Sequence, residues 1–75
     1  MTELFAIMQT LYPDIDLQTH TALIDDNIID SFSLITLIAE INDKLDVAIP
    51  AEEIIPENFN SYAALAALVS RLSEG

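Results

Sequence analysis

Residues that could do chemistry are scarce in this sequence. It has no Cys and a single His, His20, and its two basic residues, Lys44 and Arg71, lie far apart in the chain. A nucleophilic site would need His20 to meet a serine and a carboxylate, and no spacing in the sequence brings such a set together. We therefore expect no catalytic residues and no enzyme activity of the chain's own.

Acidic residues are abundant, but their spacing does not form a metal site. The stretches that begin at Asp14 and at Asp25 start like a calcium-binding loop. Such a loop needs Gly at its sixth position, which is Thr19 in the first stretch and Asp30 in the second. We expect no dedicated metal site.

The most informative polar pair is Asp30-Ser31, which precedes a strongly periodic apolar segment. One interpretation is that either residue caps a helix by accepting hydrogen bonds from free backbone amides. Another is that the Ser31 hydroxyl carries a phosphate ester, because the free N–H groups and the dipole at a helix N-terminus favour negative charge. Ser33 is a rival acceptor but lies further into the helix. These residues alone leave both interpretations open.

Three main helices must position this pair. Apolar periodicity predicts them at about residues 2–11, 31–45 and 60–72, the last capped by Asn60 or Ser61. Phe32 and Ile35 lie off the apolar stripe of the second helix, so we expect them to be partly exposed. The predicted core faces comprise Leu34, Leu37, Ile38, Ile41 and Leu45 on the second helix, and Tyr62, Leu65, Ala66, Val69 and Leu72 on the last.

The remaining segments predict a loop and a short helix. Residues 12–30 lose the helical pattern, which indicates a long loop held to the core by its own apolar side chains. Residues 51–55 predict a short third helix that is stopped by Pro56. The expected fold is therefore all-α, a single domain over residues 1–75 built as a small bundle of three main helices and one short helix. The apolar residues of the loop are Ile15, Leu17, Leu23, Ile24, Ile28 and Ile29.

Charge further limits the function. The sequence has two basic residues in total (Lys and Arg) and 13 acidic ones (Asp and Glu), which gives a net charge of −11. This charge disfavours binding to nucleic acid and favours binding to partners with basic surfaces. At 52% apolar residues the composition is that of a folded chain. There is no apolar run long enough to span a membrane, and the acidic start Met1-Thr2-Glu3 is unlike a secretory signal. We expect a cytoplasmic monomer.

The segment from Asp30 to Ile41 resembles the modification motif of acyl carrier proteins, in which Asp-Ser-Leu or a close variant opens the second helix of a four-helix bundle. Two flanking stretches match as well. Residues 23–26 resemble the loop before the motif, and residues 45–54 resemble the connector into the short third helix. The resemblance covers about residues 20–72.

Membership in this family implies that Ser31 receives 4′-phosphopantetheine from coenzyme A through a phosphopantetheinyl transferase, with Asp30 flanking the site. The thiol of that group would hold an acyl or aminoacyl group as a thioester, supplied by a loading ligase and used by downstream acyl-transferring enzymes. The chain would then be a carrier and a substrate of other enzymes. An alternative is an acidic helical interaction module that is never modified.

A docking patch beside Ser31 would accompany this role. We expect Phe32 and Ile35 at its apolar centre, although both could instead pack in the core. We expect Asp26, Glu40 and Asp43 at its rim, although each could equally be an ordinary solvated acid.

Two departures from the family pattern concern the cargo. Carriers of the fatty-acid type usually have acids two and five residues after the modified serine, where this sequence has Ser33 and Thr36. Phe32 and the stretch 56–61 look more like stand-alone carriers loaded by an adenylating ligase. D-alanyl, peptidyl and polyketide-type carriers have this character, so the pathway stays open.

Overall fold

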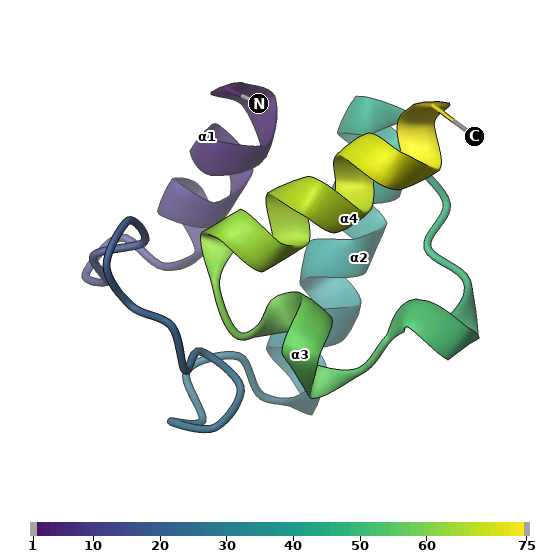
Figure 1. The fold of residues 1–75 in the computed structure, drawn as a ribbon. Helices are drawn as coiled ribbons and strands as arrows, with labels where there is room; N and C mark the ends of the chain where they lie inside the picture. The colour runs from purple at the N-terminus through teal and green to yellow at the C-terminus, as the bar shows by residue number, and fades with distance from the viewer. Residues whose placement is uncertain (1, 75) are drawn as a thin grey trace.

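The computed structural model describes residues 2–74, and this part of the chain is all-α, without strands (Figure 1). α2 lies behind α3 and α4 in the view of Figure 1, and α1 packs along α2. The expected all-α bundle is confirmed, with three main helices and one short one. The helices are α1 (Thr2–Leu11), α2 (Ser31–Leu45), α3 (Pro56–Phe59) and α4 (Tyr62–Glu74), with a short 3-10 helix at Ala51–Glu53.

Local interactions fix both ends of α2. The Asp30 side chain caps the N-terminus, because its Oδ1 accepts a hydrogen bond from the Ser33 N–H at 2.8 Å. At the other end Asp46 adopts a left-handed conformation (φ 56°, ψ 40°), which Asp tolerates better than most residues and which stops the helix. The predicted bounds of residues 31–45 are confirmed, and Ser31 is the first helical residue.

The core is apolar throughout the described residues. On α2, the fully buried residues are Leu37 and Ile41, whereas Leu34, Ile38 and Leu45 are only partly buried. The centre of the buried face therefore lies to one side of the predicted stripe. The largest fully buried side chains are Phe59, Leu4, Met8, Leu23, Leu37, Ile41, Leu65, Leu68 and Val69.

The prediction of a short helix over residues 51–55 is wrong in detail. The 3-10 helix ends at Glu53, and α3 begins at Pro56, the residue expected to stop a helix. Proline is well suited to the first helical position, because its missing N–H would have no partner there. The extended conformation of Ile55 (φ −127°, ψ 154°) separates the two short helices, as expected for a residue before proline.

α4 begins where the sequence predicts. The Ser61 Oγ accepts a hydrogen bond from the Ala64 N–H at 3.1 Å, so of the two candidate caps Ser61 is the one that caps the helix. Leu65 and Val69 are buried as expected, but Leu68, which the predicted face left out, is buried as well.

The long loop is held down in two ways. Its apolar residues Leu17, Leu23 and Ile29 are buried in the core, as predicted. In addition, Asn60, between α3 and α4, binds the loop across 35 to 37 positions in the sequence. Its backbone carbonyl accepts from the Leu23 N–H at 2.8 Å, and its side-chain Oδ1 accepts from the N–H groups of Ile24 at 2.9 Å and Asp25 at 3.1 Å. The loop is thus fixed at residues 23–25, six to eight positions before α2 begins.

Candidate functional site

Ser31 stands exposed at the N-terminus of α2. The Asp30 Oδ1 accepts from the Ser33 N–H at 2.8 Å and the Asp30 carbonyl accepts from the Leu34 N–H at 2.8 Å, and no bond of the Asp30 carboxylate to the Ser31 hydroxyl is found in the described residues. Asp30 therefore shapes the first turn of the helix and leaves the Ser31 hydroxyl accessible. Ser33, the rival acceptor, is half-buried.

The first turn of α2 has the electrostatics of an anion site. Among the described residues no acceptor pairs with the backbone N–H groups of Ser31 and Phe32, so both remain available beside the serine hydroxyl. The first turn contains no acidic residue, so only the cap Asp30 carries negative charge there. A phosphate ester on Ser31 would meet the positive end of the helix dipole.

A buried tyrosine lies beneath this turn. Tyr12, directly after α1, is only 7% exposed, and within the described residues its hydroxyl makes no well-formed hydrogen bond, although it lies close to the Ser33 side chain. Burial raises the pKa of Tyr12; the nearby Ser33 side chain opposes this shift, and the negative charge of Asp30 adds to it. The hydroxyl therefore stays protonated and neutral under the helix start.

An apolar pocket opens one helical turn from Ser31. It has a volume of about 240 Å³, and Leu34, three residues after Ser31, forms its α2 wall. The other walls come from the loop residue Ile24 and from the segment that leads into α3. The lining consists of Ile24, Leu34, Ile54, Ile55, Pro56 and Phe59, all of which are apolar.

The family model for the phosphopantetheine attachment site matches residues 6–69 of the 75-residue chain, a span that includes Ser31 and the pocket. The chain belongs to the acyl carrier protein family. No curated protein and no solved structure matches it. The prosthetic group of this carrier is 4′-phosphopantetheine, held covalently, and its general role is that of a phosphopantetheine carrier.

The residues at the start of α2 fit this group. A phosphodiester needs an accessible hydroxyl and free hydrogen-bond donors; Ser31 provides the first and the unpaired N–H groups of Ser31 and Phe32 provide the second, with Asp30 as the one acid at this helix end. Carrier domains of this family typically have no catalysis of their own. They interact with a phosphopantetheinyl transferase and with acyl-handling enzymes in general.

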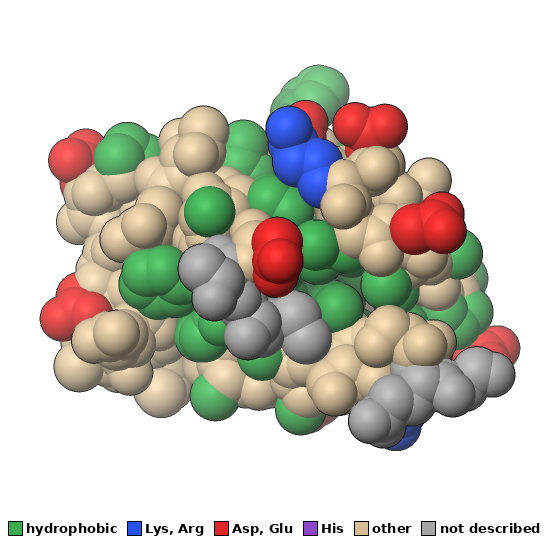
Figure 2. Space-filling model, turned by 90° about the horizontal axis from the view of Figure 1, so that it is seen from above, with side chains coloured by type: hydrophobic (Ala, Val, Ile, Leu, Met, Phe, Trp, Pro, Cys, Tyr) green, Lys and Arg blue, Asp and Glu red, His purple; other side chains and the backbone are tan. Residues whose placement is uncertain are grey.

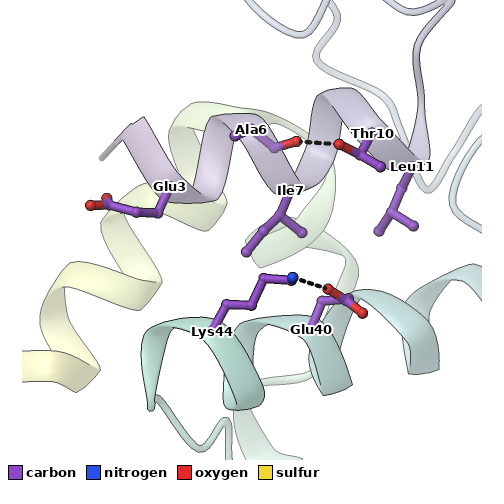
Figure 3. A pocket seen from close by; sticks show the side chains of 7 residues that line it. All are labelled: Glu3, Ala6, Ile7, Thr10, Leu11, Glu40 and Lys44. Atoms are coloured by element: carbon purple, nitrogen blue, oxygen red, sulfur yellow. Dashed lines mark hydrogen bonds and ion pairs between the residues drawn. The ribbon is translucent and has the colours of Figure 1, made fainter.

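A larger hollow lies away from Ser31. It has a volume of about 400 Å³ and lies between α1 and α2, where Ile7 and Leu11 point toward α2 (Figure 3). Glu40 and Lys44 form the α2 wall and pair with each other at 3.7 Å. Since these residues follow Ser31 by 9 and 13 positions, they lie about 14 to 20 Å further along the helix. Of the two hollows, the smaller one is therefore the one that lies within one helical turn of Ser31.

The carrier exposes apolar side chains beside Ser31. Phe32 is 85% exposed and Ile35 is 67% exposed, so the expectation that both lie outside the core is confirmed. Ile55, at the mouth of the apolar pocket, is 42% exposed. The sequence analysis missed Ile55, although its place directly before Pro56 could have indicated an extended, exposed position.

The three acids expected at the rim of the docking patch have different surroundings. Asp26 lies in the loop, 2.9 Å from the His20 Nε2. Glu40 is half-buried on the α1 side of α2 and faces Lys44, so part of its charge is already balanced. Asp43 is exposed. Elsewhere too the carrier shows separate acidic side chains among apolar ones, as on the end seen in Figure 2.

Two further findings concern the described part of the carrier. Within residues 2–74 no three His, Cys, Asp or Glu side chains are grouped so that they could hold a metal ion. None of the helices in this range has the length and apolar character needed to cross a membrane.

Proposed function

We propose that this carrier is modified at Ser31 and presents acyl or aminoacyl groups to partner enzymes as thioesters. The observation that carries the proposal is the exposed Ser31 hydroxyl at the start of α2, with unpaired N–H groups beside it and an apolar pocket one turn away. Modification forms a bond from the Ser31 oxygen to the pantetheine-bearing phosphorus of coenzyme A. Adenosine 3′,5′-bisphosphate leaves, and the hydroxyl proton is lost.

The bound prosthetic group supplies a thiol, which forms the thioester. The chain itself holds the phosphodiester and provides an apolar pocket for the acyl group. The first turn of α2 stabilises the negative phosphodiester, and Asp30 keeps that turn capped through its bond to the Ser33 N–H. The pocket that begins at Leu34 is lined by apolar residues and carries no charged side chain, so it suits an apolar acyl chain better than a charged aminoacyl group.

Docking to partner enzymes would use the exposed face of α2 next to Ser31. We assign the apolar centre to Phe32 and Ile35, because large exposed apolar side chains are typical of binding sites. Asp26, Glu40 and Asp43 would form the acidic rim, with Glu40 contributing least because Lys44 is its neighbour. The net charge of −11 would steer the carrier to basic enzyme surfaces.

The test is modification in vitro. The apo protein is incubated with coenzyme A and a broad-specificity phosphopantetheinyl transferase, and the mass of the intact protein is measured. We expect one phosphopantetheine per chain, lost in Ser31→Ala and retained in the matched variant Ser33→Ala. A mass increase that survives Ser31→Ala would overturn the site. A wild-type protein that stays unmodified would favour an interaction module without covalent chemistry.

A further inference from the structure

One ion pair joins two separate elements of the bundle. Arg71 on α4 reaches Glu53, the last residue of the 3-10 helix, with its Nη1 2.8 Å from Oε2 and its Nη2 3.4 Å from Oε1. The two contacts together form a forked guanidinium–carboxylate arrangement, which has more directional order than a single contact. The guanidinium hydrogen bonds hold the pKa of Glu53 below its ordinary value, so the carboxylate stays charged.

Asn58 extends the contact into α3. Its Nδ2 donates to the backbone carbonyl of Glu53 at 2.8 Å and lies 3.2 Å from the Glu53 Oε1. Glu53 therefore connects the 3-10 helix, α3 and α4. We call the set Arg71, Glu53 and Asn58 the latch.

The latch holds one wall of the apolar pocket. Ile54, Ile55 and Pro56 line that pocket and lie between Glu53 and Asn58 in the sequence. Another wall is Ile24, whose N–H donates to the Asn60 side-chain oxygen. The latch contacts therefore restrain the segment 54–56 beside Leu34 of α2, in addition to the packing of Ile54 against the core.

We propose that Arg71 and Glu53 are positioning residues of the cargo pocket: their ion pair keeps the segment 54–56 against α2 and so shelters the thioester cargo from attack. The inference rests on the proposed function for the cargo, but the position of the wall is a property of the unmodified chain as well. Neither residue touches Ser31 or lines the pocket. They act through the backbone between them.

The chain provides a matched control. Lys44 is the other basic residue and also pairs with an acid, Glu40, but both lie on α2 and border the hollow between α1 and α2 (Figure 3). Arg71→Gln and Lys44→Gln therefore remove the same charge and one ion pair each. Only the first disconnects the pocket wall.

The first measurement uses the apo protein and needs no cargo. Amide hydrogen exchange is followed at Ile54 and Ile55, whose N–H groups bond to the carbonyls of Ala51 and Glu53. We expect Arg71→Gln to exchange up to about fivefold faster there, and Lys44→Gln to match the wild type. In 1 M NaCl, where the screening length is about 3 Å, the wild type should approach Arg71→Gln.

The second measurement uses the carrier loaded with an octanoyl thioester, whose cleavage by hydroxylamine is timed. We expect faster cleavage in Arg71→Gln and recovery in the charge-swapped double variant Glu53→Arg with Arg71→Glu. Equal exchange and cleavage in Arg71→Gln and Lys44→Gln would overturn the proposal, as would a double variant no better than Arg71→Gln. Failure of the proposed function would look different, because the thioester would not load at all.

Discussion

Asn60→Ala tests the interaction that holds the loop before α2. The Asn60 side chain accepts hydrogen bonds from the N–H groups of Ile24 and Asp25, and its Nδ2 lies 3.3 Å from the Asp25 Oδ2. Asn60 itself has helical backbone angles (φ −72°, ψ −21°), which Ala adopts without strain. The substitution therefore removes the side-chain hydrogen bonds and leaves the bond from Leu23 to the Asn60 carbonyl in place.

The size of the effect follows from which groups lose their partner. The Ile24 N–H is part-buried, and a buried donor without an acceptor costs about 1 to 3 kcal/mol. The Asp25 N–H is exposed, so water replaces most of its bond at a cost of about 0.5 kcal/mol. We expect a loss of about 2 kcal/mol in the free energy of unfolding. For a chain of 75 residues the total free energy of unfolding is about 4 to 11 kcal/mol, so this loss would be a large part of it.

Urea and thermal unfolding followed by circular dichroism measure this loss. A decrease of about 2 kcal/mol corresponds to a fall in Tm of roughly 8 to 16 °C for a domain of this size. The matched control is Asn42→Ala, since the Asn42 amide makes only a long contact of 3.5 Å with the Val47 carbonyl. We expect this control to change stability by less than about 0.5 kcal/mol. An Asn60→Ala loss no larger than that of the control would refute the reasoning.

Three other perturbations have defined outcomes. Tyr12→Phe should leave the free energy of unfolding unchanged or raise it by up to about 1 kcal/mol, because the removed hydroxyl is buried without a well-formed hydrogen bond; a clear loss in urea melts would contradict this and show that the hydroxyl bonds to Ser33. Burial raises the pKa of Tyr12 in the folded protein, so above pH 10.0, the ordinary pKa of tyrosine, the unfolded chain loses this proton first. The free energy of unfolding of the wild type should therefore fall as the pH rises above 10.0. Tyr12→Phe should lack this contribution. Phe32→Ser should change the free energy of unfolding by less than about 0.5 kcal/mol but lower the kcat/KM of the transferase about tenfold. Unchanged kinetics would show that Phe32 does not contribute to docking. Glu53→Gln should be less stable than wild type at pH 7, and the gap should close as the pH falls below 4.5 and through the lowered pKa of Glu53; a gap independent of pH in thermal melts would contradict the role of the charge.

The sequence predicts those features that depend on local pattern. The bounds of α1 and α2, a cap at either Asn60 or Ser61 and the exposure of Phe32 follow from apolar periodicity and from the chemistry of helix ends. Local rules also allow two outcomes at Pro56, since proline ends one helix and is equally suited to begin another. The structure has the second outcome, which moves the short helix.

Long-range polar contacts could not be predicted in this way. Asn60 meets the loop 35 positions earlier, and Arg71 meets Glu53 18 positions earlier, and neither separation leaves a periodic signal. The centre of the buried face of α2, at Leu37 and Ile41, likewise depends on how neighbouring helices surround it. The candidate modification site was predicted from the resemblance of residues 30–41 and their flanking stretches to a family motif, whereas the walls of the pocket come from three separate segments.

Peptide mapping of the protein purified from its native cell tests the central claim most directly. Proteolytic fragments that contain both Ser31 and Ser33 are sequenced by tandem mass spectrometry, and the mass carried by each serine is read from the fragment series. We predict a 4′-phosphopantetheine on Ser31, bare or extended by an acyl or aminoacyl thioester, and an unmodified Ser33. An unmodified Ser31, or a phosphopantetheine found on another residue, would contradict the account.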